Sequence, residues 1–155
     1  MVMLGSLILV LGMLIQAGGV PGAAGDIFSA SEKAQMEKAN SAERRIKVYE
    51  GASKRLQQAL HEAVMKEEFG TVPDTLKLWT ALLARSLEDI EANLKSKKKP
   101  RSLINYEIQV RKAISSTQSL KIRAPIDQQD AFDSCLSRAE AIRKQLVEIL
   151  FNQSV

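Results

Sequence analysis

Apolar residues recur at alternating spacings of three and four through most of this 155-residue chain. That spacing places them along one face of an α-helix, because an α-helix has 3.6 residues per turn. A strand would require a period of two, and only 5% of the residues are aromatic, which is few for a sheet protein. The clearest apolar series comprises Ala39, Ala42, Ile46, Tyr49, Ser53, Leu56, Leu60 and Ala63. The sequence therefore predicts an all-α fold.

This series predicts a long first helix, from about Ser31 to Phe69. Gly70 would end it, since glycine suits the left-handed position that follows many helices. On the outer face an acid precedes a base by four residues, a spacing that stabilises exposed helices. These pairs are Glu43–Lys47, Glu50–Lys54 and Glu62–Lys66. The first helix is longer than its neighbours, so its N-terminal part is expected to project beyond them or to bend over them.

Three further amphipathic segments follow, each with a residue suited to begin a helix. Thr71, Ser102 and Asp127 are the expected N-terminal caps. The apolar positions are Leu76, Trp79, Leu83, Leu87, Ile90 and Leu94, then Leu103, Val110, Ala113, Ile114, Thr117 and Leu120, then Phe132, Cys135, Ala139, Ile142, Leu146 and Ile149. Short connections favour antiparallel neighbours. We expect an antiparallel up-down four-helix bundle with a long first helix, forming one domain over residues 26–155.

The first 25 residues carry no charged side chain, although 26% of the chain is charged. A nearly continuous apolar stretch from Val2 to Ile15 is followed by small residues, a pattern typical of a secretory signal peptide. Cleavage after Ala24 fits this pattern best. The alternative is an uncleaved membrane anchor, which Pro21 and the glycines around it disfavour. The sequence thus predicts a signal peptide over residues 1–25 and an exported protein, periplasmic or secreted. Within the mature chain, only residues 26–30 and those from Asn152 onward are expected to be disordered.

No familiar catalytic, cofactor-binding or metal-binding constellation is found in the sequence. A di-iron site in a helical bundle needs Glu-x-x-His motifs, but the residue three before the single histidine, His61, is Gln58. Covalent haem attachment needs two cysteines, and the chain has one. His61 follows a core position, so a surface or boundary role is expected. The protein is predicted to be a non-enzyme without catalytic residues, cofactors or metals.

Cys135 is the one thiol of the chain. Its place in the apolar series of the last segment predicts a buried side chain. Two alternatives remain open, namely a disulfide between two chains and a reactive thiol activated by Arg138.

The connection between the second and third predicted helices is strongly basic, with the sequence Lys95-Ser96-Lys97-Lys98-Lys99-Pro100-Arg101. The candidate anion-binding residues there are Lys97, Lys98, Lys99 and Arg101. Such a cluster attracts phosphates or anionic lipid headgroups. Alternatively, it is a solvated cap that interacts favourably with the C-terminal dipole of the preceding helix. The cluster lacks aromatic residues that could stack on bases, so specific nucleic-acid binding is not expected.

The segment from Lys98 through Leu120-Lys121-Ile122-Arg123-Ala124-Pro125 to Phe132 resembles a family of uncharacterised exported bacterial helical proteins. The resemblance covers roughly residues 45–152 and implies export, without any known activity or site. Two functional hypotheses follow. The first is non-enzymatic contact with an envelope protein or a second copy, through an apolar stripe around Ile46 on the first helix. The alternative is an anion- or membrane-surface-binding module that uses the basic connection.

Overall fold

The computed structural model describes residues 26–94 and 98–152, and within these ranges the chain is helical and contains no strand. The predicted signal peptide lies outside the described residues. The α-helices are α1 (Ala30–Lys38), α2 (Ala42–Met65), α3 (Val72–Asn93), α4 (Arg101–Arg123) and α5 (Gln129–Phe151). Two short 3₁₀ helices, η1 (Phe69–Thr71) and η2 (Ile126–Gln128), precede α3 and α5. The prediction of an all-α fold is confirmed for this part of the chain.

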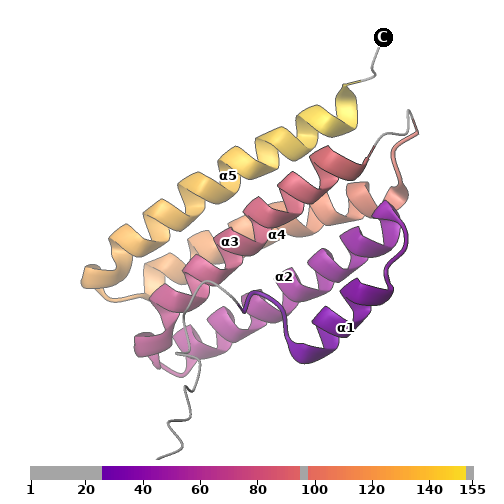
Figure 1. Ribbon diagram of the computed structural model, residues 1–155. Coiled ribbons are helices and arrows are strands. Elements are labelled where there is room, and N and C mark those ends of the chain that lie inside the picture. The colour runs from indigo at the N-terminus through magenta and orange to yellow at the C-terminus, as the bar shows by residue number, and fades with distance from the viewer. Residues whose placement is uncertain (1–25, 95–97, 153–155) are drawn as a thin grey trace, which may run out of the picture.

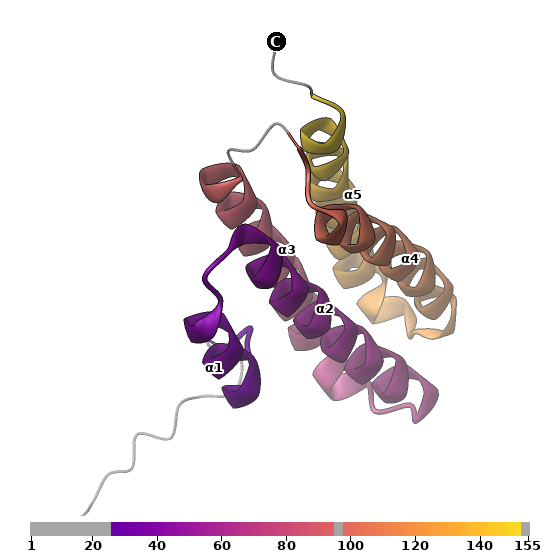
Figure 2. The same cartoon turned by 90° about the vertical axis from the view of Figure 1, so that its right-hand side faces the viewer.

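The four long helices, α2 to α5, lie side by side, and each runs in the opposite direction to the one before it (Figures 1 and 2). α2 packs against both α3 and α4, and α5 packs against the same two helices. The α3–α4 connection and the C-terminal end of α5 therefore lie at the same end of the molecule (Figure 1). The α2–α3 and α4–α5 connections lie at the opposite end.

The predicted apolar faces of the four long helices meet in the core. Trp79 is fully buried, and its indole Nε1 donates a hydrogen bond to Ser53 Oγ at 2.8 Å, linking α3 to α2. The hydroxyl oxygens of Tyr106 and Ser86 lie 2.6 Å apart and link α4 to α3. Burying each large side chain contributes about 1.5–3 kcal/mol, and the two hydrogen bonds satisfy polar atoms that burial would otherwise leave without partners.

The first helix is not the single long element that the spacing predicts. The chain leaves helical geometry at Ala39, and α2 starts anew after Ser41, whose side chain accepts a hydrogen bond from the Arg44 backbone N–H at 3.2 Å. α1 has its own N-terminal cap, in which Ser29 and Glu32 each bond the other's backbone N–H. Two N-terminal caps twelve residues apart therefore divide the predicted helix, and α1 turns back alongside α2 (Figure 2).

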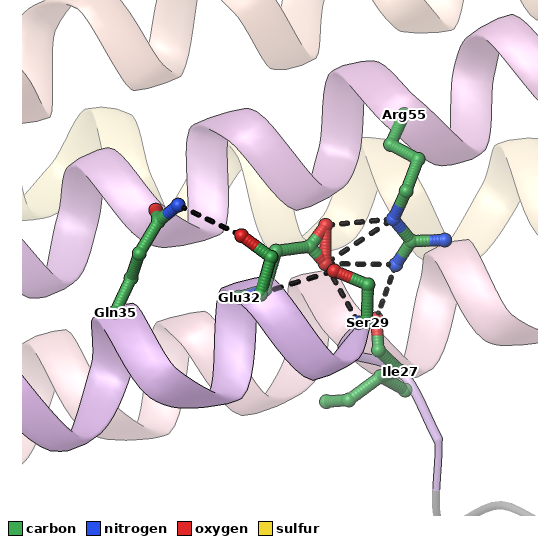
Figure 3. A network of polar contacts seen from close by, with 6 residues as sticks. Ile27, Ser29, Glu32, Gln35 and Arg55 are labelled. Carbon is green, nitrogen blue, oxygen red and sulfur yellow. Dashed lines mark hydrogen bonds and ion pairs between the residues drawn. The ribbon is translucent and has the colours of Figure 1, made fainter.

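Arg55 of α2 holds α1 in this position (Figure 3). Its Nε lies 2.6 Å from Glu32 Oε1, and its Nη2 donates to the Ile27 carbonyl oxygen at 2.8 Å. Ile27 is only 6% exposed, and the rings of Phe28 and Tyr49 lie 5.6 Å apart. The prediction that residues 26–30 are disordered is wrong, because these contacts attach them to α2.

The end of α2 also differs from the prediction. α2 ends at Met65, and the left-handed residue after it is Glu67, with φ of 57°, instead of Gly70. The Glu67 N–H bonds the Val64 carbonyl and the Glu68 N–H bonds the Ala63 carbonyl, which is the Schellman pattern. Glu67 therefore occupies a position that usually favours glycine.

Of the three caps predicted for the later helices, Thr71 occupies the expected position before α3, whereas Ser102 and Asp127 are not the cap residues of α4 and α5. α3, α4 and α5 begin after Thr71, Pro100 and Gln128, and none of these residues makes a side-chain cap hydrogen bond. Ser102 lies inside the first turn of α4. Asp127 lies within η2, two residues before α5 starts. The cap position of α3 is thus as predicted, that of α4 lies two residues earlier, and that of α5 lies one residue later because η2 precedes the helix.

Candidate functional site

The described residues of the basic connection lie at the start of α4. Lys97 lies outside the described residues, Lys98 and Lys99 precede α4, and Arg101 is its first residue. α3 ends at Asn93 with no basic residue in its last turn. The alternative, a solvated cap on the C-terminal dipole of α3, stays a prediction, because the residues that directly follow the cap residue Leu94 lie outside the described part of the chain.

This placement has an electrostatic consequence. The N-terminus of a helix carries the positive end of its dipole, where acids are stabilising and cations are unfavourable. The first turn of α4 contains no acidic residue, and Pro100 supplies no side-chain cap. Lys99 and Arg101 therefore add their charges to the positive end of α4. Such an end attracts anions.

Ser102 gives a second indication at this helix start. Its side chain is 2% exposed, and its Oγ has no hydrogen-bond partner among the described residues. A buried hydroxyl without a partner is uncommon, because leaving it unpaired costs about 1–3 kcal/mol. The first turn of α4 thus combines positive charge, without an acidic residue of its own, with a hydroxyl group that has no partner among the described residues.

A groove between α4 and α5 begins beside this turn and has a volume of about 430 Å³. Its apolar lining comprises Ile104, Ile108, Val147, Leu150 and Phe151. Three cationic side chains, those of Lys99, Arg111 and Arg143, also line it. Ile104 and Phe151 are 46% and 78% exposed, so this end of the molecule presents apolar side chains next to its cations. The groove is suited to a ligand with an anionic group and an apolar part.

Glu107 is the one acidic side chain in the groove lining. Arg143 Nε donates to its Oε1 at 3.0 Å, and Arg111 Nε lies 3.8 Å from the same oxygen. Two arginines surround one carboxylate, so the groove keeps a net positive charge. Glu107 is not among the residues predicted from the sequence, although its spacing of four from Arg111 is a visible signal of an ion pair.

A second basic segment, Lys121-Ile122-Arg123, forms the last turn of α4, at the opposite end of that helix (Figure 1). There Lys121 pairs with Asp133 of α5, and Arg123 Nη1 donates to Met65 Sδ at 3.3 Å. The two basic segments do not form one surface. The anion-binding hypothesis therefore depends on the start of α4 alone.

A carboxylate network joins α2 to α3. Asp89 accepts hydrogen bonds from Arg45 at 2.6 Å, from the Tyr49 hydroxyl at 2.7 Å and from Asn93 at 2.6 Å. Burial alone would raise the pKa of Asp89, but the bonds from Arg45 and Tyr49 outweigh it and lower the pKa below its ordinary value. Burial and the bond to Asp89 raise the pKa of Tyr49 to about 12. Because Arg45, Tyr49 and Asn93 all donate hydrogen bonds to Asp89, this network is suited to joining α2 to α3.

Cys135 is 4% exposed, as predicted, and its Sγ lies 3.9 Å from the Leu76 carbonyl oxygen. Burial raises the pKa of this thiol to about 12, so it stays protonated at neutral pH. A reactive thiol needs the thiolate and access, and a disulfide between chains needs an accessible sulfur. Both alternatives are therefore disfavoured by the position of Cys135. His61 is exposed on α2, in agreement with its expected surface role.

Within residues 26–94 and 98–152, no three His, Cys, Asp or Glu side chains gather closely enough to hold a metal ion. None of the helices in these ranges combines the length and the apolar character that crossing a membrane requires. The chain matches no protein-family model, and searches among curated proteins and solved structures return no match.

Proposed function

We propose that this protein is an exported, non-enzymatic four-helix bundle that binds anionic membrane surfaces through the start of α4. The packing of α2 and α5 against both α3 and α4 supports the up-down bundle. One observation carries the binding proposal: the cations at the positive end of α4 adjoin an apolar groove with exposed side chains. We call this surface the α4 end and define it by Lys98, Lys99, Arg101, Ile104 and Phe151.

Each part of the α4 end suits the interface of an anionic bilayer. A Lys or Arg near such a surface contributes about 1 kcal/mol of electrostatic attraction. Apolar side chains add to this when they enter the boundary between headgroups and acyl chains. Phe151 and Ile104 are exposed at the end that carries the cations, so both contributions act in the same orientation of the molecule.

Export is proposed from the uncharged segment over residues 1–25. The packed part of the chain is described from Asp26, and Ile27 is already buried. Cleavage after Ala24 would therefore leave every described contact intact. Periplasmic or secreted location, and the resemblance to exported bacterial helical proteins, stay predictions.

The hypothesis of partner binding through an apolar stripe on the first helix loses its basis. Ile46 is 1% exposed, and α1 packs back onto α2 instead of extending the stripe. A second candidate function is contact with another protein through the opposite end of the molecule, where the α2–α3 and α4–α5 connections lie (Figure 1). Met65, Ile122 and Ile126 are 47%, 85% and 92% exposed there. An Ile126→Asp variant that abolishes self-association in sedimentation velocity would support this candidate, whereas a monomeric parent protein would refute self-association.

Vesicle co-sedimentation tests the membrane proposal. The purified protein is mixed with vesicles of phosphatidylglycerol or of phosphatidylcholine, at low salt and at physiological salt. We expect binding to phosphatidylglycerol only, weaker at the higher salt because exposed charges are screened within about 8 Å. Equal binding to both lipids, or binding to neither, would contradict the proposal.

A further inference from the structure

A second groove lies between α2 and α4 and has a volume of about 450 Å³. It is lined by Glu50, Lys54, Gln57, Asn105, Ile108, Gln109, Lys112, Ala113 and Ser116. α1 lies on the other side of α2 and leaves this groove open (Figure 2). In contrast to the groove between α4 and α5, most of its side chains are polar.

Two half-buried glutamines in this groove each have one buried amide atom without a hydrogen-bond partner. Gln57 Nε2 and Gln109 Oε1 have no partner in the described part of the chain, and they come from opposite walls. The Thr117 hydroxyl lies 3.2 Å from Gln57 Oε1 and 2.8 Å from the Ala113 carbonyl oxygen. Because the hydroxyl has a single proton, it donates a hydrogen bond to only one of these two oxygens. Whichever way the Gln57 amide is turned, one of its polar atoms is left without a protein partner. Buried polar groups of this kind are rare unless something binds them.

We propose that the groove between α2 and α4 binds an extended acidic peptide segment, whose backbone hydrogen-bonds the side-chain amides of Gln57 and Gln109 after these half-buried side chains turn toward it. A peptide offers an N–H and a C=O at every residue, so it meets both an unused donor and an unused acceptor. The lining runs from Asn105 to Ser116, which is about 16 Å along α4 at 1.5 Å per residue. About five extended residues fit that length.

The charges of the rim favour an acidic segment. Lys54 pairs with Glu50 at 3.0 Å, which leaves Lys112 as the excess charge of the lining. None of the described residues that line the groove is aromatic, so a sugar ring would find no face on which to stack. Charge and shape thus favour an acidic peptide over an oligosaccharide.

The test uses the intact protein and a terminally blocked pentapeptide of alanine with two aspartates. Affinity and the shifts of the glutamine side-chain amide signals are measured by NMR titration. We expect shifts at Gln57 and Gln109, and binding about tenfold weaker in both Gln57→Leu and Gln109→Leu, as the loss of one hydrogen bond implies. Gln58→Leu is the matched control, since Gln58 is an exposed neighbour that bonds Glu62. It should bind as the parent protein does.

Thermal unfolding separates lost binding from lost folding. Gln57→Leu and Gln109→Leu should unfold at the parent temperature or above it, because each removes a buried polar atom without a partner. Lys112→Glu leaves both amides in place and should prefer a pentapeptide in which lysines replace the aspartates. Unchanged affinity in both leucine variants, or binding of an N-acetylglucosamine trimer in place of the peptide, would overturn the proposal. Neither result depends on the α4 end.

Discussion

Arg143 Nε of α5 lies 3.0 Å from Glu107 Oε1 of α4 and ties together the two walls of the groove between these helices. Glu107 is 8% exposed, and Arg111 contributes a second, longer contact to it. Because one carboxylate faces two arginines, its charge reduces the attraction that this groove exerts on anions but does not cancel it. The pair thus stabilises the packing of α4 on α5 and sets the charge of the candidate site.

Removing the Glu107 charge should strengthen binding to anionic vesicles. In Glu107→Gln the groove gains one unit of positive charge, worth about 1 kcal/mol or about fivefold in affinity near an anionic surface. Co-sedimentation with phosphatidylglycerol vesicles measures this change. Glu140→Gln is the control, because Glu140 contacts Arg143 from the exposed side at 3.7 Å. An equal gain in both variants would show that only the net charge of the protein matters.

Placing glycine at position 67 and alanine at position 70 should stabilise the protein, because each residue would then suit the local backbone conformation. Glu67 holds a left-handed φ of 57°, which costs a residue with a Cβ about 1–2 kcal/mol, so Glu67→Gly should raise the free energy of unfolding. A Cβ at Gly70 meets nothing within 4 Å, so Gly70→Ala should add about 0.4–1 kcal/mol. Urea denaturation measures both changes. A destabilised Gly70→Ala variant would instead support a left-handed cap at Gly70.

The attachment of α1 should weaken in acid. Burial would raise the pKa of Glu32, but the bonds from Arg55 and from the Ser29 backbone lower it below its ordinary value. A lowered folded-state pKa gives stability that is present above the unfolded value of about 4.3 and lost as the pH falls through the folded value. Hydrogen exchange of the α1 amides should therefore accelerate as the pH falls below about 4.3, after correction for intrinsic rates.

Arg55→Met removes the cation that lowers this pKa. Its α1 amides should lose protection already at neutral pH, while Lys54→Met, which breaks only the exposed pair with Glu50, should leave them protected. If α1 keeps its protection in Arg55→Met, Arg55 does not hold α1 on α2.

Removing either hydroxyl of the buried pair between Ser86 of α3 and Tyr106 of α4 should lower the free energy of unfolding, but by different amounts. Ser86 has one proton and bonds the Leu83 carbonyl at 2.7 Å, so Tyr106 is the donor in the 2.6 Å contact between the hydroxyls. Ser86→Ala strands a buried phenol and should cost about 1–3 kcal/mol, whereas Tyr106→Phe should cost about 1 kcal/mol. In chemical denaturation the double variant should lose less than the sum of both. Strict additivity would contradict this coupling.

Much of the fold could be predicted from spacing. The three-four repeat located the buried faces of all four long helices, including Trp79, Phe132 and Cys135. It failed at residues 39–41 because Ala39 and Ala42 continue the repeat across the break, and apolar spacing carries no information on caps. The signal for a separate α1 was present in Ser29 and Glu32, which have the spacing of a capping box.

The site was only half visible in the sequence. The cations around Lys99 form a conspicuous run, but their effect depends on how close each lies to the start of α4, a boundary that periodicity does not fix. The apolar half of the site comes partly from α5, through Val147 and Leu150, which lie beside the main apolar series of that helix. A groove between two helices depends on how they pack, which local spacing does not specify.

The most direct test of the central claim compares two charge-reversal variants with equal net charge. Lys99→Glu with Arg101→Glu alters the α4 end, and Lys66→Glu with Lys77→Glu alters exposed positions away from it. The affinity of each for phosphatidylglycerol vesicles is measured at physiological salt. Binding lost in the first variant and retained in the second is the predicted result. Equal loss in both would show attraction by overall charge, and would contradict a membrane-binding site at the start of α4.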